Sequence, residues 1–288
     1  MKRIYQSIIG LLLVLAVLFS IFIPVFAESG KTATVLFTHD LHSHFLPSVK
    51  EGGGEFGGYA RLMTAIREQR AMYPDAILVD GGDFSMGSLF QTAFASSALE
   101  LRMMGAMGYD VTTLGNHEFD YLPEGLASML RAAKASGEEI PAIVNSNYLP
   151  KESNTDIGRA FEEYGVRDYT ILERDGIYFA VFGLFGYDSD KCAPNSGMAL
   201  ETPAVAAQRT VDAAVRQCKE DYGVEPIVVC LSHSGTHNGK GEDYELAKAV
   251  DGIDVIISGH THTKLDEAIV VNGTAIVSAE DYGRNLGV

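Results

Sequence analysis

The feature that most limits the possible folds of this chain is a series of short apolar runs that each end in a polar cluster. From about residue 34 onward, these runs alternate with longer segments of helical spacing. Strands that alternate with helices indicate an α/β or layered α/β domain. Ligands of such folds gather beyond the strand ends, at one edge of the sheet. We therefore expect the polar clusters to converge on one site.

The apolar periodicity predicts the individual elements. The expected strands are residues 35–38, 76–79, 111–114, 140–144, 169–173, 178–185, 227–231, 255–258, 268–271, 275–278 and 286–288. The expected helices are residues 58–73, 93–107, 123–136, 202–222 and 244–250. Asp175-Gly176, between two apolar runs, predicts a β-hairpin. Residues 149–165 are polar and predict an irregular surface segment.

The polar clusters supply seven side chains that can bind a metal. These are Asp40, His42, Asp83, Asn116, His233, His260 and His262. Carboxylates, imidazoles and an amide oxygen suit Zn, Mn and similar divalent ions, and the absence of cysteine from the set excludes a thiolate zinc site. Alternate residues on extended backbone point the same way. We therefore expect Asp40 and His42 to share one centre, and His260 and His262 to do the same.

The number of donors predicts more than one metal ion. A single tetrahedral zinc needs only three or four protein ligands, so seven donors suit two metals if one carboxylate bridges them. Asp83 is the natural bridge, because it is the lone acid after Gly81 and Gly82, where the backbone can pass close to a ligand.

Taken in order, the clusters resemble the motifs of the calcineurin-like metallophosphoesterase superfamily. The resemblance is closest to the secreted 5′-nucleotidase family, which includes UDP-sugar hydrolases and 2′,3′-cyclic phosphodiesterases, and it covers about residues 32–288. The motif of Asp40 and His42 is weak alone, whereas residues 115–120 (GNHEFD) and 259–262 (GHTH) are much more specific. The resemblance implies a four-layer α-β-β-α sandwich with two mixed β-sheets.

The resemblance also implies a role for each site residue. It implies a first metal site formed by Asp40, His42, Asp83 and His262. It implies a second site formed by Asp83, Asn116, His233 and His260, so that Asp83 belongs to both sites. His117 and Asp120 would form a catalytic pair, and Asn116 and His117 would contact the substrate phosphate. The cofactors would be two divalent ions, such as Mn, Zn or Co, which activate a bound hydroxide for attack at phosphorus.

The expected activity is hydrolysis of nucleotide phosphate esters by an exported enzyme of the 5′-nucleotidase type. A 2′,3′-cyclic-nucleotide phosphodiesterase or a nucleotide-sugar pyrophosphohydrolase would use the same site. A non-catalytic surface-binding protein on this scaffold is a third hypothesis, although such a protein has no chemical need for all nine residues. The chain has 22 basic and 38 acidic residues, a net charge of −16, which argues against a nucleic-acid polymer as partner. Bound cations still permit a small anionic substrate.

The two ends of the chain carry separate expectations. Residues 1–27 resemble a signal peptide, with Lys2 and Arg3, an apolar run over 8–23 and a small-residue cleavage pattern. A retained membrane anchor is the alternative. Full members of the family continue into a C-terminal nucleotide-recognition domain, which we expect to be absent from this chain. Of the three cysteines, Cys230 is expected to be buried, and the pairing of Cys192 with Cys218 stays open.

Overall fold

The computed structural model describes residues 31–49, 52–152, 155–237 and 239–288, so the predicted signal peptide lies outside the described residues. The chain divides into two compact units, residues 1–32 and residues 33–288. The architecture below is that of the second unit. Among the described residues, no helix combines the length and the apolar character that crossing a membrane requires.

The first sheet contains four parallel strands in the order β1-β4-β5-β6. They are β1 (Val35–Thr38), β4 (Ile77–Asp80), β5 (Val111–Thr112) and β6 (Ala142–Ile143). Its crossovers contain α2 (Tyr59–Met72), α4 (Leu99–Met107) and α5 (Leu122–Ser136). Parallel strands need such helical crossovers, and their two buried faces explain the almost uninterrupted apolar runs of the sequence.

The second sheet is mixed and has the order β13-β14-β12-β11-β9-β8. Its strands are β8 (Tyr169–Arg174), β9 (Ile177–Phe185), β11 (Ile227–His233), β12 (Val255–Ser258), β13 (Ile269–Val271) and β14 (Thr274–Val277). Only the edge pairs β8–β9 and β13–β14 are antiparallel. The predicted hairpin is confirmed: Asp175 and Gly176 join β8 to β9 with φ values of 48° and 75°. Of the two sheets expected to be mixed, this one is mixed and the first is wholly parallel.

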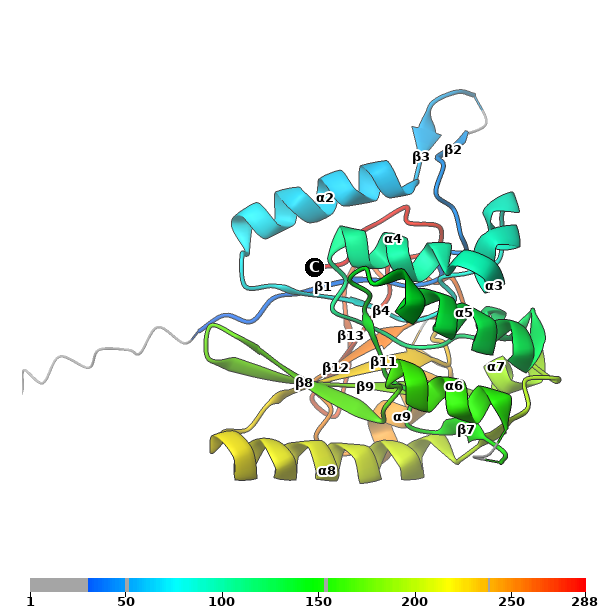
Figure 1. The fold of residues 1–288 in the computed structure, drawn as a ribbon. Coiled ribbons are helices and arrows are strands. Elements are labelled where there is room, and N and C mark those ends of the chain that lie inside the picture. The colour runs from blue at the N-terminus through cyan, green and yellow to red at the C-terminus, as the bar shows by residue number, and fades with distance from the viewer. Residues whose placement is uncertain (1–30, 50–51, 153–154, 238) are drawn as a thin grey trace, which may run out of the picture. The chain divides into compact units, whose positions relative to one another are not determined.

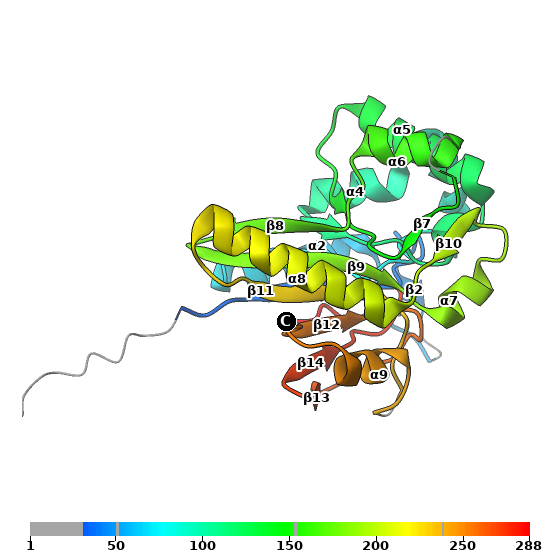
Figure 2. The same cartoon turned by 90° about the horizontal axis from the view of Figure 1, so that it is seen from below.

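Three buried apolar clusters show that the two sheets pack face to face between two helical layers. Phe37 and Val79 of the first sheet meet Val181 and Leu231 of the second. A second cluster lies between the first sheet and α2, α4 and α5, and a third between the other sheet and α8 (Pro203–Tyr222) and α9 (Glu242–Ala249). Figures 1 and 2 show α2, α4 and α5 on one side of the sheets and α8 on the other. The predicted four-layer sandwich is confirmed.

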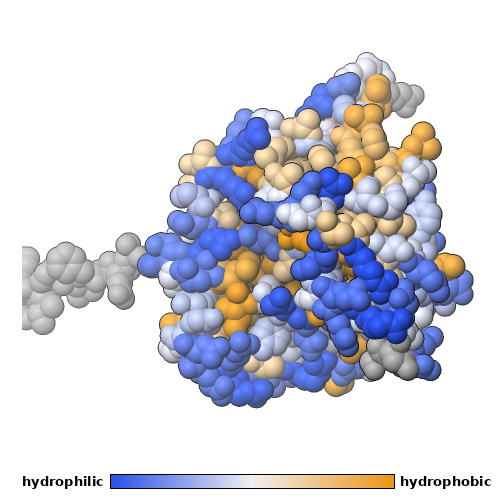
Figure 3. Space-filling model, in the orientation of Figure 1, coloured by the Kyte–Doolittle hydropathy of each residue, from blue (hydrophilic) through white to orange (hydrophobic). Residues whose placement is uncertain are grey.

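Short elements complete the unit. These are β2 (Ser48–Val49), β3 (Glu55–Phe56), η1 (Leu89–Ala93), α3 (Phe94–Ser97), η2 (His117–Phe119), β7 (Tyr148–Pro150), α6 (Asp156–Tyr164), α7 (Tyr187–Cys192) and β10 (Met198–Leu200). The face drawn in Figure 3 is mostly hydrophilic, with apolar side chains gathered near β2 and β3. Leu46 and Val49 are exposed beside these strands.

Three predicted segments differ from the structure in more than their bounds. The helix expected over residues 93–107 is broken at Ala98, whose φ of 48° ends α3 and begins α4. The irregular segment expected over 149–165 is wrong, because it contains β7 and α6. The missed helix has its own signals: Thr155 accepts the N–H of Gly158 as N-cap, and Ile157 and Phe161 bury one face. The strand expected over 286–288 is reduced to a single bridge to Phe37.

All three cysteines are free. Cys218 and Cys230 are buried, as expected for Cys230, whereas Cys192 is exposed on α7. The pairing that the sequence left open is therefore not made in this structure.

Candidate metal centre and active site

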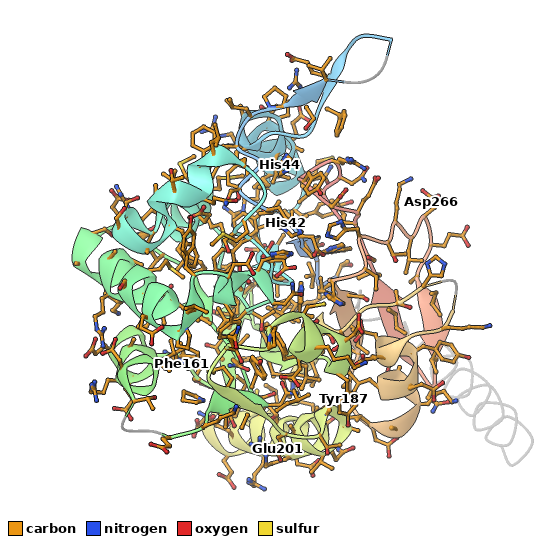
Figure 4. All side chains as sticks on the ribbon, turned by 90° about the vertical axis from the view of Figure 1, so that its right-hand side faces the viewer. His42, His44, Phe161, Tyr187, Glu201 and Asp266 are labelled. Atoms are coloured by element: carbon orange, nitrogen blue, oxygen red, sulfur yellow. The ribbon has the colours of Figure 1, made fainter. Side chains whose placement is uncertain are left out.

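The polar clusters lie at the carboxyl ends of strands from both sheets. Asp40, Asp83 and Asn116 follow β1, β4 and β5 of the first sheet, while His233 ends β11 and His260 follows β12. Because β1, β4 and β5 are parallel to one another, as are β11 and β12, the carboxyl ends within each set reach one edge. Figure 4 looks onto that edge, with His42 near its centre.

The backbone is left-handed at most of the predicted donors. Five of them have φ between 48° and 74°: Asp40, His42, Asp83, His260 and His262. The extended backbone assumed for the two alternating pairs is therefore wrong. Such conformations are uncommon for residues other than glycine and cluster at functional sites, where the surrounding fold holds them.

Two glycines allow the loops after β4 and β5 to touch. A Cβ on Gly82, whose φ is 89°, would lie 2.8 Å from the backbone nitrogen of Gly115. A Cβ on Gly115 would collide with Oδ1 of Asp83. The close approach that these glycines permit brings Asp83 beside the loop that carries Asn116 and His117.

Glu118 holds the same two loops together, although the sequence assigned it no contact. Its fully buried carboxylate accepts the N–H groups of Asp83 and Ser85 at 3.0 Å each and that of Gly115 at 2.6 Å. Burial, followed by the nearby Asp83 carboxylate, raises the pKa of Glu118 to about 7. One acidic side chain thus ties the β4 loop to the β5 loop.

The first donor group consists of Asp40, His42 and His262. Their ligand atoms lie within 4.8 Å of one another. Oδ1 of Asp40 is 3.7 Å from Nε2 of His42 and 3.4 Å from Nε2 of His262. The two Nε2 atoms are 3.0 Å apart, a separation that only a shared proton or a shared cation makes favourable. Zn–N bonds of about 2 Å place neighbouring ligand atoms at about this spacing.

The second donor group consists of Asp83, Asn116, His233 and His260. Oδ2 of Asp83 is 3.0 Å from Nε2 of His233. Oδ1 of Asn116 lies 3.2 Å from that same nitrogen and 2.9 Å from Nδ1 of His260. One carboxylate, one amide oxygen and two imidazoles therefore face a single point, and this donor set suits a divalent transition metal.

Asp83 lies between the two groups. Its Oδ2 is 3.0 Å from Nε2 of His233 and 3.9 Å from Nε2 of His42, which belongs to the first group. His260 and His262, only two residues apart, face different groups, so the spacing argument that gave them a common centre is wrong. Both residues are left-handed, so neither has the extended backbone on which that argument rested.

Backbone carbonyls fix the protonation of two of these imidazoles. Nδ1 of His42 donates to the carbonyl of Met86 at 2.8 Å, and Nδ1 of His233 donates to the carbonyl of Gly81 at 2.9 Å. Nε2 of each ring is therefore directed at the donor groups. Such outer partners orient metal-binding histidines.

The charges of the second donor group are tightly coupled. Burial disfavours a charged His233, but the adjacent Asp83 carboxylate outweighs burial and raises the pKa of His233 to about 10. Burial likewise opposes ionisation of Asp83, yet attraction from His233 lowers its pKa. Metals bind the neutral imidazole, so metal loading would release protons here.

His117 and Asp120 form a pair at the mouth of the site. His117 begins η2, and Oδ2 of Asp120, three residues later, lies 2.8 Å from its Nδ1. This hydrogen bond, against the opposing effect of burial, raises the pKa of His117 to about 9. The His117 ring is 5.0 Å from the ring of His42, and its backbone N–H donates to Asp83. The two side chains stay partly exposed, at 39% and 44%.

The remaining histidines have separate places. His39 is buried beside Asp40, His44 stacks on Tyr282 with ring centroids 3.9 Å apart, and His237 pairs with Lys240 through backbone hydrogen bonds. The contacts of Glu118 were not predictable from the sequence, because its spacing of three residues from Gly115 matches no motif.

Comparisons with known proteins show the family of the chain. Residues 33–264 match the family described as calcineurin-like phosphoesterase. The chain is 35% identical over 278 residues to the trifunctional nucleotide phosphoesterase protein YfkN of Bacillus subtilis, with 88% of this chain and 18% of that protein covered. It is 31% identical over 262 residues to a probable 5′-nucleotidase of Treponema pallidum, covering 88% of this chain and 40% of the relative.

Solved structures give the same result for the fold. The crystal structure of a 5′-nucleotidase precursor from Thermus thermophilus superposes with a TM-score of 0.73 at 25% identity, covering 89% of this chain and 50% of that one. The NAD nucleotidase of Haemophilus influenzae gives a TM-score of 0.71 at 22% identity, over 88% of this chain and 52% of that one. The chain thus spans less than half of the curated relatives described above.

Proposed function

The chain belongs to the calcineurin-like phosphoesterase family, and from this premise we propose that it hydrolyses phosphate esters of nucleotides with the help of two divalent metal ions. One observation carries the proposal: two donor groups meet at Asp83, and the His117–Asp120 pair stands beside them. This arrangement suits chemistry at phosphorus, where two cations and a hydrogen-bonding side chain face the same substrate group.

We assign the metal ligands by donor group. Asp40, His42 and His262 would hold the first ion, Asn116, His233 and His260 would hold the second, and Asp83 would bridge them. When bound, such ions act as Lewis acids, activate water and neutralise phosphate oxygens. Mn, Zn and Co all suit this set of oxygen and nitrogen donors.

The chain's own residues would complete the reaction. His117, on the exposed side of the donor groups, would donate a hydrogen bond to a phosphoryl oxygen and assist the leaving oxygen. Asp120 would orient its imidazole through Nδ1, which directs Nε2 towards the substrate. Asn116 would contact the same phosphate.

The substrate class is proposed from the relatives. Their names, 5′-nucleotidase and trifunctional nucleotide phosphoesterase, favour phosphate esters of nucleotides. Among these we propose monoesters first and cyclic diesters second. Export is proposed from the pattern of residues 1–27. We also propose that nucleotide recognition involves a C-terminal domain in the full-length protein, with residues 32–288 as the catalytic domain.

A substrate panel tests the proposal. AMP, a 2′,3′-cyclic nucleotide, UDP-glucose and p-nitrophenyl phosphate are assayed with and without chelator. Metal-dependent hydrolysis of AMP supports the monoesterase, and a faster reaction with the cyclic nucleotide supports the diesterase. Metal-loaded protein that hydrolyses none of the four contradicts the proposed function.

A further inference from the structure

His260 and His262 each contact a carboxylate through the ring nitrogen that does not face their donor group. The outer nitrogens of His42 and His233 meet backbone carbonyls, but those of His260 and His262 meet Asp188 and Asp281. These two histidines also present opposite ring nitrogens to the centre. His260 presents Nδ1 and His262 presents Nε2, so each ring must be held in a different tautomer.

At the second donor group, Asp188 contacts His260 from α7. Oδ2 of Asp188 lies 3.2 Å from Nε2 of His260, while Nδ1 of the same ring is 2.9 Å from Oδ1 of Asn116. Asp188 is 59% exposed, but its backbone is held. The N–H groups of Tyr187 and Asp188 donate to the carboxylate of Glu242 at 2.7 and 2.9 Å, which joins α7 to α9. Tyr187 marks this helix in Figure 4.

At the first donor group, Asp281 contacts His262 from the segment after β14. Oδ2 of Asp281 is 3.0 Å from Nδ1 of His262, whose Nε2 lies 3.4 Å from Oδ1 of Asp40. The other oxygen of Asp281 is 3.2 Å from Arg284. The Asp281 side chain is only 8% exposed, so its position is set by packing.

We propose that Asp188 and Asp281 are positioning residues that select the metal-binding nitrogen of His260 and of His262, respectively. A neutral imidazole has a single N–H, and an ionised carboxylate can only accept a hydrogen bond. Each carboxylate therefore accepts a hydrogen bond from the N–H of the ring nitrogen it faces and leaves the lone pair of the opposite nitrogen for a cation. The inference rests on the proposed two-metal function.

A different use of Asp188 would be as a ligand. Asp188, Cys192 and His260 could offer atoms within 4.8 Å of one another for a further ion. That ion would need the Nε2 lone pair of His260, whereas the positioning role puts a proton on this atom. The two uses therefore predict opposite protonation of one nitrogen.

Zinc titration of the purified full chain tests the positioning role. Asp188→Ala should weaken zinc binding at the second site about 10–100-fold and leave the first site unchanged, and Asp281→Ala should do the reverse. Asp188→Asn and Asp281→Asn keep an acceptor oxygen and should retain most of the affinity. Because Asp281 is buried, Asp281→Asn also shows whether a loss of affinity in Asp281→Ala comes from misfolding. Lys191→Ala is the matched control, because Lys191 contacts Oδ1 of Asp188 at 3.5 Å, whereas His260 contacts Oδ2.

Nitrogen-15 NMR of the zinc-loaded protein shows which ring nitrogen of each histidine carries the proton. A purely structural role of Asp188 and Asp281 would leave this protonation unchanged. His260 should carry its proton on Nε2 and His262 on Nδ1, and each alanine variant should mix the tautomers of its own histidine only. Unchanged affinity and tautomers in both alanine variants overturn the inference while leaving the two-metal proposal intact. A third zinc equivalent that is lost in Cys192→Ala and Asp188→Ala also overturns it. A wild-type chain that binds none of zinc, manganese and cobalt refutes the proposed function itself.

Discussion

The imidazole of His39 forms a hydrogen bond with the carboxylate of Asp40, with Nδ1 of the ring 2.5 Å from Oδ2. The direction of this hydrogen bond is fixed from the other side of the ring, because Nε2 accepts the backbone N–H of Ala279 at 2.6 Å. The proton must therefore lie on Nδ1. The N–H of His260 donates to the same oxygen of Asp40 at 2.9 Å, which leaves Oδ1 to face His42 and His262.

This relationship predicts that His39 acts on metal affinity. His39→Ala should weaken binding of the first metal about 10–100-fold, because Asp40 loses one of its two orienting donors. His39→Asn supplies an amide N–H and should restore part of the affinity. Calorimetric titration with zinc measures both variants, and equal affinity in wild type and His39→Ala would contradict the role.

The bridging position of Asp83 predicts the loss of both metals at once. EDTA should abolish hydrolysis, and Mn, Co or Zn should restore it to a protein that holds close to two ions per chain. Asp83→Asn should lower occupancy at both sites, whereas His42→Ala should affect the first site more. Metal analysis by mass spectrometry checks this, and two fully occupied sites in Asp83→Asn would exclude the bridge.

The His117–Asp120 pair predicts a catalytic defect without a metal defect. His117→Ala should lower kcat by roughly 10²–10⁴, the range for a general acid or base, because we assign its side chain to the substrate phosphate and not to a metal site. Asp120→Asn should lower kcat less, since it only orients the imidazole. Steady-state kinetics with p-nitrophenyl phosphate and a metal count for each variant separate the two effects.

Buried Asp243 predicts a pH-dependent stability. Its carboxylate accepts from Ser232 and Ser258 at 2.5 Å each, but burial prevails and raises its pKa to about 7, above the ordinary value of 3.8. The folded state therefore binds the proton more tightly than the unfolded state. This contribution to stability is complete below about pH 4 and is lost as pH rises to about 7, by at most about 1.4 kcal/mol per pH unit.

Asp243→Asn resembles the protonated form and should remove this contribution. Urea unfolding at pH values from 4 to 8 should show a smaller loss of the free energy of unfolding in the variant than in wild type across that window. Parallel curves for the two proteins would mean that Asp243 does not titrate there.

Much of the fold was predictable because its signals are local. The strands β1 and β12 have their predicted bounds, since each contains a continuous run of three apolar residues flanked by polar residues, a signal that needs no tertiary contact to be recognised. The helix α6 is hidden by the polar composition of its segment, which is typical of a loop. Its signals are the N-cap Thr155 and the helical spacing of the buried residues that begin at Ile157.

The sequence by itself determined which side chains would gather: Asp40, Asp83 and Asn116 each follow an apolar strand, and parallel strands bring such positions to one edge. Only the tertiary structure decided how the donors divide. His260 and His262 face different groups although they are only two residues apart, because neither has the extended backbone that would give their side chains a common direction. Glu118, Asp188 and Asp281 gain their roles by approaching other segments across the edge. Sequence periodicity describes one element at a time, and these contacts join elements that only packing brings together.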